Sequence, residues 1–311
     1  MQPVDFEAMA ERVRNWGRWG DDDNRGTLNH IDPAALSRAT AAATSGKLFG
    51  LGLQFSENGP MRGIFRRNPK LYVTALAEAI DPTNPRACFS DDDISMSLQC
   101  ATHWDGLTHA HYDGLLYNGC KACDVLTTRG ATRLGAEHLA SPGILSRGVL
   151  ADIARLKGVD VLPTDYAITP ADLDEALARA GQAVAPGDIL LVRTGQIRRF
   201  VVEDNAEALS GSQCGLAPEC AGWLYDHRLA AVAADNVAVE LISPESMSGY
   251  MPLPLHMMCL REMGMPLGEM WNLEALAADC AADGRYAFLL SAPPLGITGA
   301  FGSPVNPTVL K

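Results

Sequence analysis

The chain has 311 residues, of which 47% are hydrophobic and 20% charged, as expected for a globular protein. Its net charge of −12 argues against nucleic acid or an anionic membrane as a partner and favours a small-molecule ligand. No apolar run approaches the roughly 20 residues of a membrane-spanning helix, and the first residues lack the pattern of a secretory signal. A cytoplasmic protein without a membrane partner is therefore expected.

Helix and strand signals alternate along the chain. Capping residues, prolines at the first helical position and terminal glycines predict helices at 32–46, 169–181, about 254–263 and 272–284. Short apolar runs predict strands at 94–98, 148–150, 188–193, 230–234 and 286–290. Several of these runs are apolar on consecutive residues, which is typical of a sheet covered on both faces. The alternation predicts an α/β fold, with residues 1–311 in a single domain.

Residues 1–70 are predicted to form an extended, irregular N-terminal arm. A large share of the aromatic residues lies in this arm, at Trp16, Trp19, Phe55 and Phe65. Such an arm is expected to wrap a neighbouring subunit or to cover a pocket.

The eight cysteines follow no regular spacing, which in a chain without a secretory signal indicates reduced thiols. Cys120 and Cys123 form a C-x-x-C pair with no second pair to complete a zinc site. A zinc or redox role for them is the less favoured interpretation, and two free thiols are the favoured one.

Three of the seven histidines lie within nine residues, at His103, His109 and His111. Because side chains alternate along a strand, an extended segment places His103 and Asp105 on the same face. Gly106 permits a turn that returns His109 to them, and Gln99 lies near the same edge. Imidazole, carboxylate and amide oxygen together predict a mixed site for a first-row divalent ion, with polar surface side chains as the alternative.

His256 and Glu269 form a second candidate pair. His256 is predicted in the first turn of its helix, where the helix dipole favours the neutral imidazole that binds metal. The predicted helix stop at Gly264 allows the chain to double back and bring Glu269 close to His256. Taken alone, the pair is equally consistent with a buried histidine and a surface glutamate.

These residues resemble the cyclase family of metal-dependent hydrolases, which includes bacterial kynurenine formamidase, isatin hydrolase and trans-dienelactone hydrolase. The family motif is His-x-Gly-Thr-His-x-Asp-x-Pro-x-His, and this chain has Gln-Cys-Ala-Thr-His-Trp-Asp-Gly-Leu-Thr-His at 99–109. The resemblance continues through 187–195, Asp235, His256, Glu269 and the Gly-Ser-Pro at 302–304. It implies a mixed β-sheet, barrel-like core flanked by helices, of the swivelling β/β/α type. Family members are commonly oligomers, so a homo-oligomer, either a dimer or a tetramer, is expected.

The resemblance also implies roles for individual residues. His103, Asp105, His256 and Glu269 correspond to metal ligands, and His109 corresponds to the catalytic histidine that acts as a general base. Glu269 is expected to act in catalysis as well as in metal binding.

Gln99 departs from the family motif, which has a metal-binding histidine at this position. If Gln99 is a ligand, its amide oxygen is a harder and weaker donor than imidazole, and should shift the metal preference from Zn²⁺ towards Mn²⁺. One or two ions are compatible with this ligand set.

The implied activity is hydrolysis by metal-activated water. The expected bond is the C–N or C–O bond of a small cyclic amide, a lactone, or an N-formyl or other amide, which would make the enzyme an amidohydrolase or a lactonase. Two alternatives remain open. The same site could close the ring of a biosynthetic intermediate without hydrolysis, or Gln99 could mark a metal-free binding protein descended from the enzyme.

Several further residues are predicted near the substrate. Aromatic side chains are expected to form an apolar pocket wall, namely Trp104, Tyr112, Phe55 and Phe65. His111 either lines this pocket or is structural, and Arg66 and Arg67 either bind a substrate carboxylate or are simply exposed. Asp235 is expected to orient a metal ligand or to cap a loop.

Overall fold

A nine-stranded mixed sheet forms the centre of the molecule. The computed structural model describes residues 5–61 and 65–311, and its sheet has the strand order β1-β15-β13-β7-β9-β11-β12-β4-β14. The strands, in that order, are Leu48–Gly50, Thr308–Leu310, Ala287–Ser291, Leu145–Asp152, Ile189–Arg193, Ala231–Ala234, Leu267–Glu269, His103–Asp105 and Gly302–Pro304. Strands β7, β9, β11 and β12 are parallel, and the outer strands pair antiparallel.

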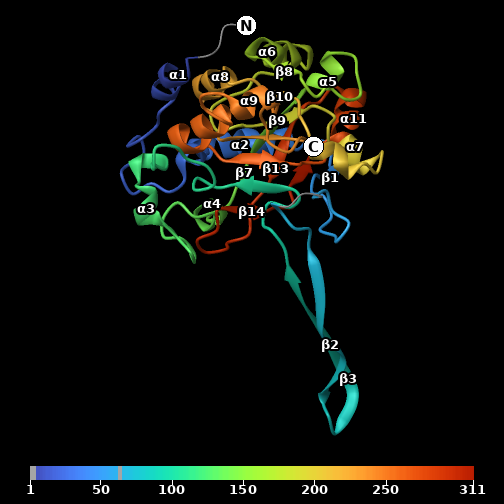
Figure 1. The fold of residues 1–311 in the computed structure, drawn as a ribbon. Helices are drawn as coiled ribbons and strands as arrows, with labels where there is room; N and C mark the ends of the chain where they lie inside the picture. Colours follow the sequence, from blue (N-terminus) through green and yellow to red (C-terminus); the bar gives the residue numbers. More distant parts are fainter. Residues whose placement is uncertain (1–4, 62–64) are drawn as a thin grey trace.

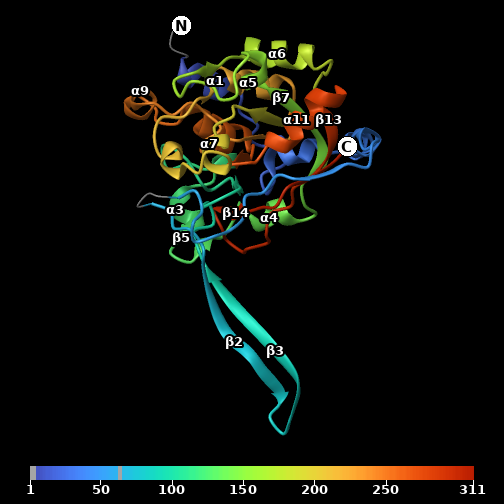
Figure 2. The same cartoon turned by 90° about the vertical axis from the view of Figure 1, so that its right-hand side faces the viewer.

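Helices cover the curled sheet on both faces (Figures 1 and 2). The α-helices are α1 Phe6–Arg12, α2 Pro33–Ala42, α3 Ala122–Val125, α4 Glu137–Ala140, α5 Ile153–Leu156, α6 Pro170–Arg179, α7 Arg198–Val201, α8 Cys220–Asp226, α9 Pro244–Ser248, α10 Pro254–His256 and α11 Glu274–Asp283. A π-helical segment, Met257–Met263, continues α10, and 3₁₀ turns lie at Gly26–His30, Tyr117–Gly119 and Ala206–Leu209. No helix among the described residues is long and apolar enough to cross a membrane.

The central strands are buried because both of their faces are covered. Every residue of β9 and β11 is buried, as the consecutive apolar residues predict. One face packs against α1, α6, α8 and the π-helical segment. The opposite face packs against α11 and the Trp104–Trp271 pair. The prediction of a single-domain α/β fold with a mixed, curled sheet is therefore confirmed.

Local capping explains where two of the predicted helices begin. The Asp32 side chain accepts a hydrogen bond from the Ala35 backbone N–H at the start of α2. Thr169 and Asp172 form a reciprocal capping box at the start of α6. The predicted helix at 254–263 is present as α10 and its π-helical continuation, and the predicted helix at 272–284 is α11.

Two regions differ from the sequence-based expectation. Within the described part of residues 1–70, the chain forms α1, a 3₁₀ turn, α2 and β1, and the side chain of Phe6 joins the main core. Of the predicted strand at 94–98, only residues 94 and 95 lie in a strand, because β3 is Asn84–Ser95 and the chain leaves it after Ser95. Strand β3 pairs with β2, Lys70–Asp81. This two-stranded ribbon extends far from the body (Figures 1 and 2). Two short sheets complete the fold, β8 (Ala167–Ile168) with β10 (Gly215–Leu216) and β5 (Leu126–Thr127) with β6 (Gly130–Ala131).

A close approach of two backbones ties the N-terminal segment to the helix that carries His256. The Thr27 N–H donates to the Gly264 carbonyl oxygen at 2.9 Å, and a Cβ on Gly26 would lie 1.9 Å from that oxygen. Gly26 also has φ +56, which favours glycine.

We expect Gly26→Ala to lower the free energy of unfolding by more than about 3 kcal/mol, because the backbone of Gly264 cannot move without breaking this junction. Gly46→Ala is the matched control, since Gly46 has φ +73 but no atom within 4 Å of its would-be Cβ. The control should lose about 1 to 2 kcal/mol from backbone strain alone. Urea denaturation measures both, and equal losses would contradict the close-packing argument.

Candidate metal centre

Two adjacent antiparallel strands place three polar side chains on one face. Strand β4 pairs with β12 so that His103 is opposite Glu269 and Trp104 is opposite Gly268. Because side chains alternate, His103 and Asp105 project to the same face, and Glu269 joins His103 across the ladder. The predicted meeting of these residues is therefore present in the structure.

Trp104 projects to the opposite face. Its indole N–H donates to the Ala292 carbonyl oxygen at 2.8 Å, and its ring packs edge-on against Trp271. The side chain is completely buried in the core. The expectation that Trp104 lines a substrate pocket is therefore wrong, because the same alternation that gathers His103 and Asp105 turns Trp104 away from them.

His256 reaches the same centre from the start of its helix. Glu240 accepts hydrogen bonds from the backbone N–H of His256 at 2.8 Å and of Leu255 at 3.2 Å, and also contacts the His256 Nδ1. With Nδ1 as the donor to Glu240, the Nε2 lone pair faces the centre. Nε2 lies 3.2 Å from Glu269 Oε1 and 3.7 Å from Asp105 Oδ2. Sequence reasoning missed Glu240, because no local pattern links it to a histidine sixteen residues away.

Four buried side-chain atoms at this centre have no hydrogen-bond partner among the described residues. These atoms are His103 Nε2, both carboxylate oxygens of Asp105 and Glu269 Oε2. His103 Nε2 lies 3.3 Å from Asp105 Oδ1 and 3.2 Å from Glu269 Oε2, and its Nδ1 faces the Ala101 carbonyl oxygen at 2.7 Å. Leaving such groups unsatisfied is costly unless a ligand satisfies them. One ligand atom from each of His103, Asp105 and Glu269 lies within 4.8 Å of the others, so the donor set suits a divalent metal ion.

Electrostatics of the protein without metal support the same conclusion. Burial disfavours the imidazolium, but the carboxylates of Asp105 and Glu269 raise the pKa of His103 to about 9. The same two carboxylates, together with Glu240, raise the pKa of His256 well above its usual value. Burial likewise opposes the Asp105 carboxylate, but His109, His103 and His256 lower its pKa. Burial and the Asp105 charge oppose the Glu269 carboxylate, but His103 and His256 lower its pKa. Protons on the imidazoles therefore balance the two carboxylates, a role that a divalent cation can take over.

His109 lies at the exposed side of this centre. Its Nε2 is 3.6 Å from Asp105 Oδ1, and its side chain is 25% exposed. The Asp105 carboxylate favours the imidazolium of His109, but burial and the charges of His256 and Arg66 outweigh it and lower the pKa of His109. A neutral imidazole next to the metal ligands can accept a proton at neutral pH.

Gln99 and Arg66 also border the centre. The Gln99 side-chain nitrogen lies 3.5 Å from His109 Nδ1, so the structure places Gln99 against the candidate base. Its role as a metal ligand stays a prediction. Arg66 donates to the Gln99 carbonyl oxygen at 3.1 Å, and its Nη1 lies 3.6 Å from Glu269 Oε2. Arg66 therefore faces the centre, whereas Arg67 is exposed.

The remaining predicted pocket residues are scattered. The Tyr112 hydroxyl donates to Glu262, and its ring packs against Phe6. Phe55 is half-buried and packs against the cluster that contains Cys100, Ala101 and Met270. Of the other residues predicted to line the pocket, Phe65 is 91% exposed and His111 is half-buried.

Asp235 caps a loop instead of contacting a metal ligand directly. Its Oδ1 accepts hydrogen bonds from the backbone and the hydroxyl of Thr194, and its Oδ2 accepts one from the Gly195 N–H. Of the two roles predicted for Asp235, loop capping is the one that the contacts support. Cys120 and Cys123 form no disulfide in the structure.

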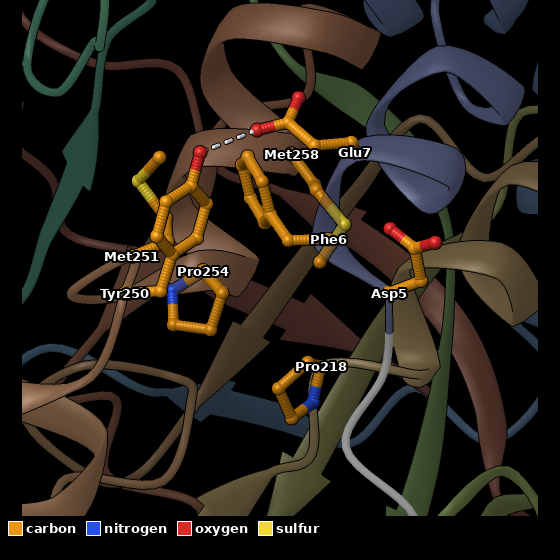
Figure 3. Close-up of a pocket in the computed structure, with 8 residues that line it drawn as sticks. All are labelled: Asp5, Phe6, Glu7, Pro218, Tyr250, Met251, Pro254 and Met258. Carbon is orange, nitrogen blue, oxygen red and sulfur yellow. Dashed lines mark hydrogen bonds between the residues drawn. The ribbon is translucent and has the colours of Figure 1, made fainter.

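An apolar pocket of about 360 Å³ lies beside α10 but does not include the metal centre. It is lined by Asp5, Phe6, Glu7, Pro218, Tyr250, Met251, Pro254 and Met258 (Figure 3). The Tyr250 hydroxyl donates to Glu7 across its mouth. None of the residues of the candidate metal centre lines this pocket.

The fold and this cluster of imidazoles and carboxylates define an α/β protein with a buried candidate metal site. Residues 35–241 match the model of the family described as "Putative cyclase". A crystal structure of a novel cyclase is 39% identical, with a TM-score of 0.88 and coverage of 97% of this chain and 99% of that one. The chain belongs to the cyclase family.

More distant structures share the fold. Isatin hydrolase A from Labrenzia aggregata, bound to benzyl benzoate, is 18% identical, with a TM-score of 0.63 and coverage of 88% of this chain and 98% of that one. A potential metal-dependent hydrolase with cyclase activity is 15% identical, with a TM-score of 0.51 and coverage of 85% of this chain and 98% of that one. Comparison with curated proteins found no match.

We expect purified protein to bind a divalent ion at this centre and His103→Ala to lose it, because the variant removes a buried ligand. Affinity should rise as the pH rises towards about 9, because metal binding must displace the proton from His103. Elemental analysis gives the metal content, and titration calorimetry in buffers of different ionisation enthalpy counts the protons released. His138→Ala, which changes a half-exposed histidine outside the centre, is the control. Equal metal content in both variants would contradict the assignment.

We expect Glu240→Gln to weaken metal binding by about 10- to 100-fold, because the carboxylate that holds the His256 ring is lost. Asp235→Asn is the matched control, since it neutralises another fully buried carboxylate without touching His256. Competition with a metal-chelating dye measures both affinities. If both variants bind metal equally well, Glu240 does not position the ligand.

Proposed function

We propose that this protein is a metal-dependent hydrolase that cleaves the C–N or C–O bond of a small cyclic amide, a lactone, or an N-formyl or other amide. The observation that carries the proposal is the buried centre where His103, Asp105, His256 and Glu269 converge with unpartnered donor atoms. The isatin hydrolases that share the fold, one of them bound to the product analogue thioisatinate, support a hydrolytic reaction.

These four residues would hold the metal ion. The ion, Mn²⁺ or Zn²⁺, supplies Lewis acidity and a water whose pKa is lowered from 15.7 towards about 7. Asp105 and Glu269, the two carboxylates among the proposed ligands, together carry two negative charges, which one divalent ion neutralises. A second ion would bring four positive charges against three carboxylates, counting the Glu240 that contacts His256. The Gln99 side chain is directed to His109, so we favour one ion held without a fifth protein ligand.

His109 would move the proton during the reaction. As a neutral imidazole at the exposed side of the centre, it can accept a proton from the attacking water and return it to the leaving nitrogen or oxygen. Gln99 can stabilise the tautomer that acts as a base if its amide is turned so that the oxygen accepts from the His109 Nδ1–H. The Nε2 lone pair then lies on the side of Asp105 and is free to accept the proton. Glu269 contacts both His103 and His256, and it can assist His109 in the reaction by accepting a hydrogen bond.

Arg66 would recognise an anionic part of the substrate. Its guanidinium borders the centre and is only 24% exposed, so it is more desolvated than an ordinary surface arginine. A substrate whose ring or chain carries a carboxylate next to the scissile bond fits this arrangement best.

We expect His109→Gln to lower kcat by about 100- to 10,000-fold with an unchanged metal content, because the variant removes proton transfer but none of the four proposed ligands. The assay screens lactones, cyclic amides and N-formyl compounds in water labelled with ¹⁸O. Hydrolysis incorporates one solvent oxygen into the product, whereas a non-hydrolytic ring closure incorporates none. Product without the label would overturn the hydrolase proposal in favour of a cyclase, and wild-type protein that takes up no metal would favour a binding protein.

A further inference from the structure

Three non-glycine residues with a left-handed backbone adjoin the candidate metal centre. Val239, with φ +59, directly precedes Glu240, and Met270, with φ +56, directly follows Glu269. The third, Leu253, directly precedes α10 and has φ +50. Residues other than glycine rarely adopt this conformation, and a β-branched valine is an outlier there. Strain of this kind persists only where the surrounding contacts enforce it, and it clusters at functional sites.

Val239 is held in this conformation by the side chain of Asn236, which is fully buried. Asn236 Oδ1 accepts a hydrogen bond from the Val239 N–H at 2.8 Å, and its Nδ2 donates to the Cys214 carbonyl oxygen at 2.7 Å. The Asn236 carbonyl oxygen also accepts a hydrogen bond from the Met270 N–H at 2.8 Å. One asparagine therefore fixes the backbone of both strained residues, Val239 and Met270.

The short strand β10 closes the space around Val239 and Glu240. The Leu216 N–H donates to the Val239 carbonyl oxygen at 2.9 Å. A Cβ on Gly215 would lie 2.3 Å from the Glu240 carbonyl carbon and 2.6 Å from the Val239 carbonyl oxygen. The peptide between Val239 and Glu240 therefore cannot relax without displacing β10.

We infer that Asn236 is a positioning residue, which holds Val239 in its strained conformation and thereby sets the direction of the Glu240 side chain. Glu240 in turn accepts hydrogen bonds from the backbone N–H groups of Leu255 and His256 and contacts His256 Nδ1. In a relaxed loop the Glu240 carboxylate turns, and the His256 ring loses its fixed orientation towards the centre. The chain therefore gives up stability at Val239 to orient a metal ligand. This inference rests on the proposed function, because it concerns a ligand of the proposed metal ion.

The first test compares two substitutions at one position, Val239→Ala and Val239→Gly, in the full-length protein. Both remove the buried valine side chain, but only glycine relieves the left-handed strain. We expect the equilibrium constant for unfolding in urea to be about 3- to 10-fold smaller for Val239→Gly than for Val239→Ala, because the relief of strain outweighs the extra chain entropy of glycine. The same Val239→Gly variant should bind Mn²⁺ and Zn²⁺ about tenfold more weakly than Val239→Ala, because its relaxed loop no longer fixes Glu240.

The two measurements on this pair are therefore expected to run in opposite directions. At an unstrained position glycine is the less stable of the two residues, so that order of stability would overturn the proposal. Equal metal affinity of the two variants, measured by competition with a chelating dye, would overturn it as well.

The second test compares Asn236→Ala with Gln196→Ala. Gln196 is also a fully buried amide, and it donates to the Leu162 carbonyl oxygen at 3.0 Å and contacts the Cys214 sulfur at 3.3 Å. Both variants lose buried hydrogen bonds, so both should be less stable than the wild type. Only Asn236→Ala should also bind Mn²⁺ and Zn²⁺ more weakly, by about tenfold or more.

A readout without metal separates this inference from the proposed function. In metal-free protein with ¹⁵N-labelled histidine, NMR measures how fast the His256 Nδ1–H, which faces Glu240, exchanges with water. We expect exchange at least about tenfold faster in Asn236→Ala than in Gln196→Ala, because the loosened Glu240 protects this proton less. Equal exchange rates would overturn the positioning role of Asn236. A wild type that takes up no metal but shows the expected difference in exchange would overturn the proposed function and leave the positioning role standing.

Discussion

The burial of two carboxylates beside two imidazoles is the constraint on which the rest of this structure depends. Asp105 and Glu269 are almost inaccessible to water, and a pair of like charges at this depth is stable only with compensating positive charge. In the absence of metal, the histidines supply that charge as imidazoliums. The surrounding fold must therefore hold four titratable side chains in one place while the charges on them change.

The sheet holds these side chains in place through the pairing of its strands. Strand β12 lies between the parallel strand β11 and the antiparallel strand β4, so Glu269 is fixed from both sides. Gly268 leaves room for this packing, because a Cβ there would lie 2.5 Å from the Ala233 side chain and 3.0 Å from the Trp104 ring. The Trp104–Trp271 pair on the other face then fills the space behind the centre. The packing of Trp104 against Trp271 thus fixes the strands that carry His103, Asp105 and Glu269, although neither indole contacts the centre.

The sequence predicted those parts of the site that depend on local periodicity. Alternation along one strand was enough to pair His103 with Asp105, and the glycine stop at Gly264 correctly indicated that Glu269 returns to His256. The same alternation places Trp104 on the opposite face, in the core, whereas its aromatic character alone suggested a pocket wall. Glu240 could not be found in this way, and the role of Arg66 could not be separated from that of Arg67, because these contacts depend on how distant segments meet. The ribbon was missed for a different reason, since most of its apolar residues are exposed and a search for buried strands does not detect them.

The substitution of Gln99 for a family histidine is best understood together with Arg66. An amide at this position leaves the buried centre with one imidazole fewer, and its nitrogen faces the candidate base His109. Arg66 contributes a permanent positive charge within 3.6 Å of a Glu269 oxygen and is attached to the backbone of Gln99 itself. One divalent ion would balance Asp105 and Glu269, and the Glu240 carboxylate behind His256 would offset the guanidinium in the overall charge. Arg66 is the cationic group at the border of the centre, so it favours an anionic part of the substrate on that side. Arg66 and Gln99 lie at the two ends of the segment that forms the ribbon. The hydrogen bonds at the base of the ribbon therefore hold together the two segments that bring Arg66 and Gln99 to the centre.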